Sequence, residues 1–503
     1  MFKKNLLLYA AVILFLVVTS YFYLNNSLSF HFVDEEHNLV LGSFLLKGEK
    51  MYQDMFNNHQ PLAHIISAFI QYITHPNSIY SLIKTHREFM IIWTFAWSIF
   101  LLKRFTTKVV LFIFLYELAK IVLLGNLFLS ESLIIYPLVY LIALLLDGIK
   151  TRKEYFLIGF WLSFIALTFA PVWPVLLFIL GWLAIKVIKK DYKLYLYLLI
   201  GFLPLVIIVL RFITVSDYFF DTVYINSKYY IPYGIEMGSD NVSMLSFLTP
   251  VLSFFSPILS PLRIFVNILS AFLIFSLTLL IKQKKYALVI SLIILLGLAN
   301  IRYVQPGQDY YRGFHLLPWF AILIFICSYF GAYFYHHLVK LNKNILLILI
   351  GLSLVLAFVV SKPTLFAKRD IQQDLYINYS RQFDNGVIVN IMKQNKETLF
   401  VSPDEWLVYW QADINHPRKM INYYDWMSRS PELRSKIDDI FNYQRPTYLY
   451  CNCPQSSYLT KYFSAYTKIK KFNDNIPLFV LSDKLKKLTP AQKDKLKFYG
   501  VIL

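Results

Sequence analysis

The sequence predicts a mainly α-helical protein: a polytopic membrane bundle with a small α/β domain at its C-terminal end. The chain has 503 residues, of which 57% are hydrophobic and only 16% are charged. Apolar runs of about 20 residues, the length that crosses a bilayer as a helix, recur as far as residue 361. Beyond that point charged residues return and apolar residues come in short bursts. We therefore expect a membrane domain over 1–361 and a separate domain over 362–503.

The apolar runs predict about eleven membrane spans, each of roughly the length a bilayer requires. Lys3 and Lys4 precede the first run, 5–24, which we interpret as a retained span rather than a cleaved signal peptide. The further spans are expected near 88–103, 109–124, 132–147, 155–171, 174–188, 194–213, 258–281, 286–300, 314–334 and 344–361.

The basic residues indicate the orientation of the bundle. With the N-terminus inside, the short inner loops carry most of the Lys and Arg, and the longer outer loops carry few, which is the positive-inside pattern. The net charge of +19 is thus explained by topology signals, and we expect no nucleic-acid partner. Loop 25–87 and the domain 362–503 then lie outside the cytoplasm. The inner basic residues are Lys103, Arg104, Lys108, Lys150, Arg152, Lys153, Lys186, Lys189, Lys190, Lys193, Lys282, Lys284, Lys285, Lys340 and Lys343.

The C-terminal segment has the pattern of a small α/β domain. Bursts of apolar and β-branched residues at 399–403, 447–451 and 477–482 predict strands. Residues 431–441 predict a helix with Ser430 as its N-cap. A segment of about 140 residues is long enough to form its own core.

The three cysteines do not predict a disulfide framework. Cys451 and Cys453 are separated by one residue, and we expect them to be too close in sequence for an ordinary bridge.

Loop 25–87 is too long for a simple connection and gathers acidic residues just beyond the first span. Asp34, Glu35 and Glu36 are consecutive, and Asp54 and His59 follow before Pro61. Carboxylates at a membrane surface are costly unless they are used or paired. Residues 61–73 are apolar enough to lie along the membrane as an interfacial helix.

This loop resembles the first outer loop of the GT-C glycosyltransferases, above all the protein O-mannosyltransferases and lipid A aminoarabinose transferases (glycosyltransferase families 39 and 83). Those loops have an Asp-Glu pair, a short helix, a Gly-x-x-x-Tyr-x-Asp segment and a Pro-Leu pair. Two later segments are also similar to the family: one at the start of the fourth span and one before a late span. The matching residues are Asp34, Glu35, Gly48, Tyr52, Asp54, Pro61 and Leu62, then Ser130 and Glu131, and then Tyr310, Tyr311, Arg312, His315 and Pro318.

The resemblance implies an enzyme that moves a sugar from a polyprenyl-phosphate donor to an acceptor outside the cytoplasm, whether protein, lipid or cell-surface glycan. Asp34 would be the general base or would orient the acceptor, supported by Glu35. Glu131 would hold the acceptor or contribute to the electrostatics of the site. The substrate-binding residues would be Tyr52, Asp54, His59, Arg302, Tyr311, Arg312 and His315, with Arg302, Arg312 and His315 on the donor phosphate.

Two departures from the family keep parts of this assignment open. Aminoarabinose transferases have Glu-Lys before the loop proline, whereas this chain has His59 and Gln60, which leaves the phosphate ligands open. The residues do not fix a cofactor, and a divalent cation stays open: Asp34, His59 and Glu131 together are of the type that binds one.

Some of these residues also fit structural roles. Asp54 would equally well orient the loop, and Glu36 reads as a simple charge in the first turn of a helix. Glu117 and Lys120, three residues apart inside a span, read as a structural ion pair.

A transporter or lipid flippase is the alternative function. Transporters place charges at mid-membrane, often in two repeated halves. This chain shows acids at span ends and no repeat, so the transferase is favoured.

Overall fold

The computed structural model describes residues 2–149, 151–188, 193–236, 241–242, 260–299, 302–303, 310–335, 340–471 and 476–502. The described chain is mainly helical and forms two compact units, each built from three separate segments. Unit 1 comprises Met1–Ser27, Arg87–Ile208 and Gly238–Arg369, and unit 2 comprises Leu28–His86, Val209–Met237 and Asp370–Leu503. The boundary expected between 361 and 362 lies near the end of unit 1, but a single cut does not separate the two units.

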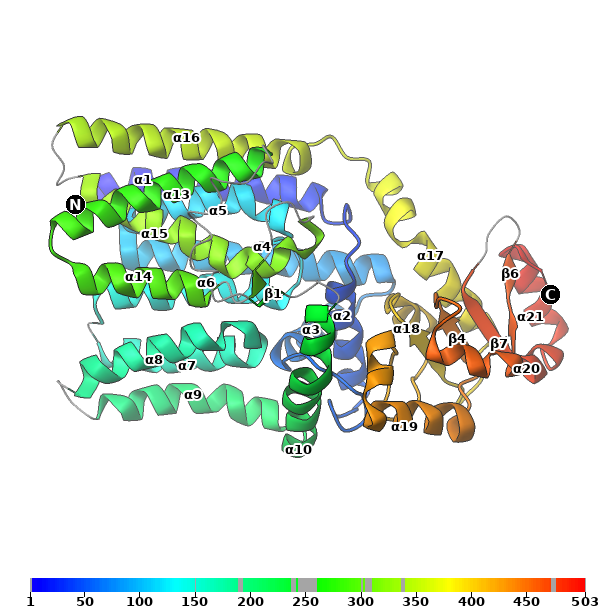
Figure 1. Ribbon diagram of the computed structural model, residues 1–503. Helices are drawn as coiled ribbons and strands as arrows, with labels where there is room; N and C mark the ends of the chain where they lie inside the picture. Colours follow the sequence, from blue (N-terminus) through cyan, green and yellow to red (C-terminus); the bar gives the residue numbers. More distant parts are fainter. Residues whose placement is uncertain are drawn as a thin grey trace. The chain divides into compact units, whose positions relative to one another are not determined.

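Unit 1 is a bundle of long apolar helices, many of which run side by side (Figure 1). Its helices are α1 (Phe2–Asn25), most of α4 (Ile79–Phe105), α5 (Val110–Ala119), α6 (Ser130–Asp147), α7 (Arg152–Thr168), α8 (Trp173–Ile188), α9 (Leu194–Leu210), α13 (Pro261–Lys282), α14 (Tyr286–Leu298), α15 (Leu317–Tyr335) and α16 (Lys340–Leu365).

Five helical segments in the described part of the chain are long and apolar enough to cross a bilayer. The protein is therefore an integral membrane protein, as the apolar runs predicted. Shorter apolar helices occur at 170–185, 194–210 and 286–298, and the figure of about eleven spans stays a prediction. The five segments are Leu6–Asn25, Ser130–Asp147, Pro261–Lys282, Gly313–Tyr335 and Asn342–Leu365.

Helices α6 and α15 form the centre of unit 1. They pack against each other, and α15 also packs against α5 and α13. Their side chains are buried almost all round, whereas α1 and α16 leave many large apolar side chains exposed. A helix that is apolar on every side belongs in an interior, and exposed apolar faces suit lipid.

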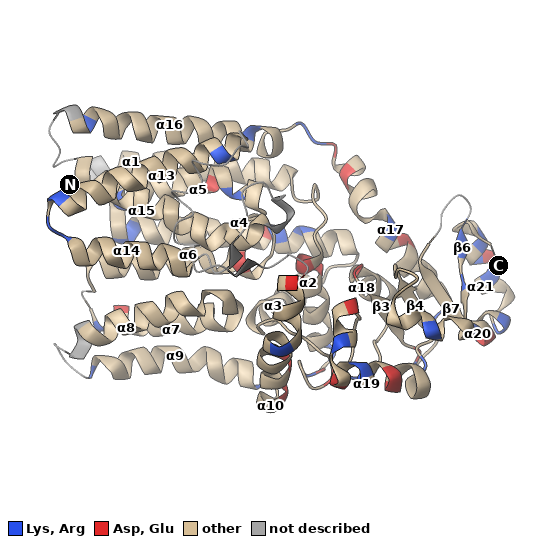
Figure 2. Ribbon diagram, in the orientation of Figure 1, with Lys and Arg blue, Asp and Glu red and all other residues tan. Residues whose placement is uncertain are grey.

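Several charged residues of unit 1 form ion pairs. Lys120 Nζ lies 2.7 Å from Glu117 Oε2, and both side chains are buried, so the predicted ion pair is confirmed. At one end of the bundle, Arg104 pairs with Asp147 at 2.8 Å and with Glu154 at 2.6 Å. Figure 2 shows basic residues at helix ends, including the α13–α14 turn.

Unit 2 contains a four-stranded sheet of order β3-β4-β7-β5. Strands β3 and β4 are parallel, and the other two pairings are antiparallel. The three predicted strands are confirmed as β3, β4 and β7, and helix α19 begins after the Ser430 cap as predicted. The strands are β3 (Leu399–Ser402), β4 (Tyr448–Cys451), β5 (Tyr466–Lys468) and β7 (Leu478–Leu481), with a small pair of β6 (Lys470–Lys471) and β8 (Val501–Ile502).

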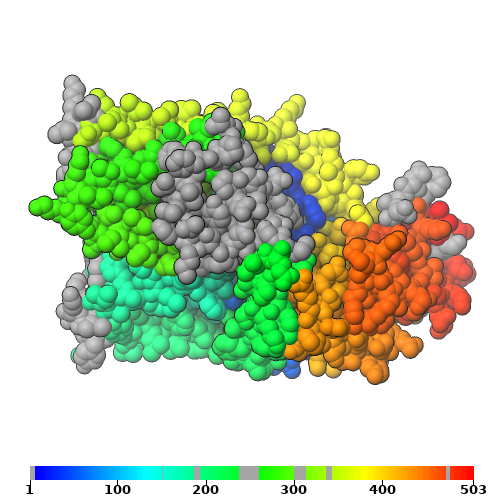
Figure 3. All heavy atoms as spheres, in the orientation of Figure 1, coloured from blue at the N-terminus to red at the C-terminus, as the bar shows by residue number. Residues whose placement is uncertain are grey.

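The helices of unit 2 come from all three of its segments. Phe56 and Ile225 share one buried apolar cluster with Phe400, Trp426 and Leu449, so residues 28–86 and 209–237 pack into the same core as the C-terminal segment. Figure 3 shows residues 215–236, in green, against the orange C-terminal segment. The helices are α2 (Val33–Leu46), α3 (Leu62–Thr74), α10 (Val215–Tyr218), η4 (Phe219–Tyr230), α11 (Ile231–Glu236), α17 (Ile371–Met392), α18 (Leu407–Ala412), α19 (Pro431–Asp439), α20 (Ser482–Lys486) and α21 (Pro490–Phe498).

The expectation that Cys451 and Cys453 do not pair is wrong. The structure joins them in a disulfide with their Cα atoms 5.1 Å apart, which is within the range a disulfide spans. Strand β4 ends at Cys451, and the chain turns there and brings the second thiol close. Cys327 is a buried free thiol.

Helices α7 and α9 approach so closely that only glycine fits at two positions. A Cβ on Gly159 would overlap the Leu198 carbonyl, and one on Gly201 would overlap the Phe156 carbonyl. We predict that Gly159→Ala lowers the stability of the solubilised protein by about 1–3 kcal/mol, because two backbones must separate. Thermal unfolding in detergent measures the effect.

Gly181→Ala in α8 is the matched control, since a Cβ there meets no atom within 4 Å. It should be neutral or stabilising by about 0.5–1 kcal/mol, the ordinary gain from replacing glycine in a helix. Equal destabilisation by both variants would contradict the close contact of α7 and α9.

Candidate functional site

Asp34 lies in the first turn of α2, together with Glu35 and Glu36. The first amides of a helix have no partner within the helix, and the positive end of its dipole favours carboxylates there. Glu35 and Glu36 are each 1% exposed, whereas Asp34 is half-buried. Of the three consecutive acids, Asp34 is the one that remains accessible.

Glu36 is held by two side chains. His31 Nε2 lies 2.6 Å from Glu36 Oε1, and Gln382 Nε2 donates to both carboxylate oxygens at 2.9 and 3.1 Å. The sequence predicted a simple first-turn charge at Glu36. The structure instead buries the carboxylate against a helix of the C-terminal segment, which no local pattern indicates.

The loop between β3 and α18 adds two acids that the sequence analysis missed. Tyr424 donates its hydroxyl to Asp404 Oδ1 at 3.1 Å. Burial raises the pKa of Asp404, and the charge of Glu36 raises it further. Burial and the Glu36 charge also raise the pKa of Glu405, to about 7. The only signal in the sequence is the Asp-Glu pair directly after a strand.

Asp34 belongs to the same electrostatic cluster. Burial raises the pKa of Tyr424, and the charges of Asp404 and Asp34 raise it further. Tyr424 therefore feels an acid from α2 and an acid from the β3–α18 loop. Residues far apart in sequence thus place Asp34, Glu36, Asp404 and Glu405 within one region of unit 2.

Hydrogen bonds between side chains and the backbone fix the loop that carries His59. Tyr52 donates its hydroxyl to the His59 carbonyl at 2.8 Å, and the His59 amide donates to Asn57 Oδ1 at 3.0 Å. The Asn57 amide in turn donates to Asp221 Oδ2 of η4 at 3.1 Å. The His59 side chain is exposed. The fixed loop thus presents this imidazole outward.

Two buried histidines lie behind this loop. The centroid of the His37 ring lies 4.9 Å from that of His59, 5.2 Å from that of His64 and 4.7 Å from that of Trp406. Burial lowers the pKa of His37, and it lowers the pKa of His64 to about 3. These rings are neutral at physiological pH and serve as packing between α2, α3 and α18.

Tyr52 and Asp54, which the resemblance places at the substrate, both make internal hydrogen bonds. The Tyr52 hydroxyl is engaged by the loop, as described above. Asp54 Oδ2 accepts the Lys50 amide at 2.8 Å, which closes a local turn. The turn favours the interpretation that Asp54 orients the loop.

In unit 1, two predicted site residues meet. Glu131 lies in the first turn of α6 and is 4% exposed. His315 Nδ1 lies 2.9 Å from Glu131 Oε1. Arg302 falls in the two-residue strand β2 (Arg302–Tyr303), and Tyr311 and Arg312 fall in η7 (Tyr310–Leu316). The side chains of Arg302, Tyr311 and Arg312 lie outside the described part of the chain.

A metal site is not evident in the residues that the structure describes: no three His, Cys, Asp or Glu side chains there are arranged to hold an ion. Asp34 and His59 belong to unit 2 and Glu131 belongs to unit 1, so this ligand set stays a prediction.

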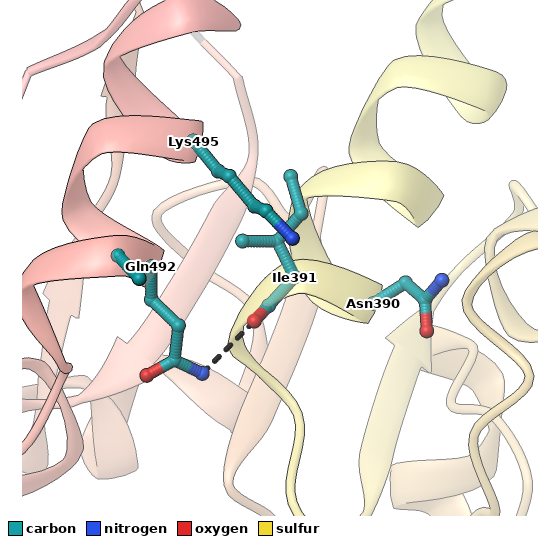
Figure 4. A pocket seen from close by; sticks show the side chains of 5 residues that line it. Asn390, Ile391, Gln492 and Lys495 are labelled. Carbon is teal, nitrogen blue, oxygen red and sulfur yellow. Dashed lines mark hydrogen bonds between the residues drawn. The ribbon is translucent and has the colours of Figure 1, made fainter.

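A cavity of about 260 Å³ lies elsewhere in unit 2, between α17 and α21. Figure 4 shows Gln492 donating to the Ile391 carbonyl at its edge, at 2.9 Å. The residues that line this cavity include no carboxylate, so the cavity lacks a base such as Asp34. They are Asn390, Ile391, Ala491, Gln492 and Lys495.

Solved structures decide the fold. The structure of ArnT from Cupriavidus metallidurans in the apo state matches with a TM-score of 0.50 and 10% identity, covering 94% of this chain and 98% of that chain. The same protein bound to undecaprenyl phosphate matches with the same values. The chain has the GT-C fold. The predicted resemblance is thereby confirmed at the level of fold.

A weaker match carries no further weight. The oligosaccharyltransferase of Archaeoglobus fulgidus, tethered to an acceptor peptide, has a TM-score of 0.47 and 9% identity over 87% of this chain and 68% of that chain. No protein-family model and no curated protein matches the sequence. The roles of individual residues on this GT-C fold therefore rest on the geometry described above.

Asp221 supplies a pH test of the loop that carries His59. Burial raises its pKa from 3.8 to about 7, partly offset by Lys436. Between those values the folded state retains a proton that the unfolded state has released, so the stability from this group falls as pH rises. Asp221→Asn removes that loss. We predict that the variant gains stability relative to wild type between pH 4 and 7, by on the order of 3 kcal/mol.

Thermal unfolding of the solubilised protein at several pH values measures this difference. Asp494→Asn, which removes an exposed carboxylate of α21, is the control and should follow the wild-type curve. An Asp221→Asn curve parallel to wild type would show that Asp221 does not retain a proton in the folded state.

Proposed function

We propose that this protein is a membrane glycosyltransferase that moves a sugar from a polyprenyl-phosphate donor to an acceptor outside the cytoplasm. The GT-C fold shared with ArnT supports the proposal, and one ArnT structure is bound to undecaprenyl phosphate. The observation that carries it is the position of Asp34. It is an accessible carboxylate at the N-terminus of α2, within about ten residues of the end of α1.

Asp34 is suited to act on the acceptor. As the bond between the sugar's anomeric carbon and the phosphate oxygen breaks, the acceptor hydroxyl or amine forms the new bond to that carbon. Its proton passes to the Asp34 carboxylate, and the polyprenyl phosphate leaves with the bonding electrons. Because the donor's lipid tail remains in the bilayer, a base for this reaction has to lie close to a span end.

The donor phosphate requires positive charge or hydrogen-bond donors. Glu131 holds His315 at 2.9 Å through Nδ1. Such a carboxylate fixes the orientation and tautomer of an imidazole. We assign His315, with Arg302 and Arg312, to the donor phosphate and Glu131 to orienting His315. Of the two roles expected for Glu131, this favours the electrostatic one over holding the acceptor.

The charge distribution supports an active site outside the cytoplasm. Basic residues lie in the loops that the positive-inside rule places within the cell. Asp34 follows the first span and would then lie on the opposite side. The acceptor is a protein, a lipid or a cell-surface glycan, each of which offers a hydroxyl or amine on that side.

Asp34→Asn should abolish transfer while expression and membrane insertion stay intact, because the amide cannot accept the proton. The assay incubates membranes containing the protein with radiolabelled undecaprenyl-phosphate sugars and measures the label that leaves the lipid. Asp494→Asn, an exposed carboxylate in α21, is the control and should keep full activity. Label that crosses the membrane but stays on the lipid would indicate a flippase instead. Full transfer by Asp34→Asn would show that Asp34 takes no part in the mechanism.

Glu131→Gln should raise the KM for the labelled donor about tenfold with a smaller change in kcat, since a hydrogen bond to a charged group is worth about 1.5–3 kcal/mol. Steady-state kinetics over a range of donor concentrations measures KM and kcat separately. An unchanged KM for the donor would show that His315 does not bind the donor phosphate.

A further inference from the structure

Gln382 is a buried amide with both ends engaged. It lies on α17 and is 1% exposed. Its Nε2 donates to both oxygens of Glu36 at 2.9 and 3.1 Å and lies 2.7 Å from His31 Nε2. Its Oε1 accepts the Leu407 amide at 3.1 Å. One side chain thus joins the segment that carries Asp34 and Glu36 to the segment that carries Asp404 and Glu405.

The first of these segments is the N-terminal turn of α2. Glu36 is two residues after Asp34 on that helix, so a bond to Glu36 limits how the turn can rotate or slide. His31 makes a second contact to the same carboxylate from the extended chain before the helix.

The second segment is the loop from β3 to α18. Leu407 is the first residue of α18, and Asp404 and Glu405 lie three and two residues before it. Glu405 has φ +74°, a left-handed conformation that is unfavourable for glutamate and persists only where the surroundings impose it. The bond from Gln382 to the Leu407 amide is one of those restraints.

We propose that Gln382 is a positioning residue of the transfer site, which holds the Asp34 turn and the Asp404–Glu405 loop in one arrangement. This inference rests on the proposed function. It gives the C-terminal segment a part in the reaction: α17 does not touch the substrate but sets where the base lies. A displacement of about 1 Å at a reacting group can cost about 100-fold in rate.

The test exchanges the two partners. Gln382→Glu places a second carboxylate against Glu36, and the repulsion should lower kcat about 100-fold while the KM for undecaprenyl-phosphate sugar changes less than about twofold. In the double variant Glu36→Gln/Gln382→Glu, the amide at 36 donates to the carboxylate at 382, which still accepts the Leu407 amide. We expect the double variant to recover at least about tenfold of the lost kcat.

Asn385→Ala is the matched control for a loss of folding. Asn385 is an equally buried amide one turn later on α17, and it donates to the Tyr450 hydroxyl at 3.3 Å rather than to α2. It should keep the wild-type kcat even where its thermal midpoint falls. The inference is supported if kcat falls in Gln382→Glu and returns in the double variant.

The contrary results are distinct. Wild-type kcat in Gln382→Glu overturns the inference and leaves the proposed function standing. A second contrary result is that kcat falls together with the thermal midpoint in both Gln382→Glu and Asn385→Ala and does not recover in the double variant. Gln382 would then have only a structural role. A wild-type protein that releases no label from any donor overturns the proposed function itself.

Discussion

The burial of the Glu36 carboxylate is the constraint on which unit 2 depends. Taking an ion out of water costs several kcal/mol unless good hydrogen bonds replace its hydration. The replacements come from His31, just before α2, and from Gln382, some 350 residues later. The N-terminal loop and α17 therefore stabilise each other, and neither segment is expected to hold this arrangement alone.

A second buried carboxylate connects the remaining segment. Asp221 of η4 accepts the Asn57 amide, and Asn57 in turn binds His59 and lies 3.0 Å from His64. Phe56 and Ile225 enter the same apolar core on either side of this bond. Polar links and apolar packing thus act at the same places, which explains why unit 2 assembles from three stretches of chain rather than from the C-terminal stretch alone.

The sequence predicted those features whose information is local. The apolar runs give the membrane helices, the short bursts give β3, β4 and β7, and Ser430 with Pro431 gives the start of α19. Asp34 and Glu35 were found because their neighbours form a motif. Gln382, Asp404 and Glu405 were missed because nothing near them in sequence records that they meet α2. The Cys451–Cys453 bridge was missed because it depends on how the chain turns after β4.

The pairing of Glu36 also bears on the place of Asp34. Residues 35–42 of α2 are all buried, so the helix is covered on every side once past its first residues. Asp34 is the acid nearest the open end of the helix, and its side chain is half-buried. The bonds from His31 and Gln382 to Glu36 fix the first turn of α2, and with it the place of Asp34 two residues earlier. An interaction that stabilises the fold therefore also sets where the accessible carboxylate lies.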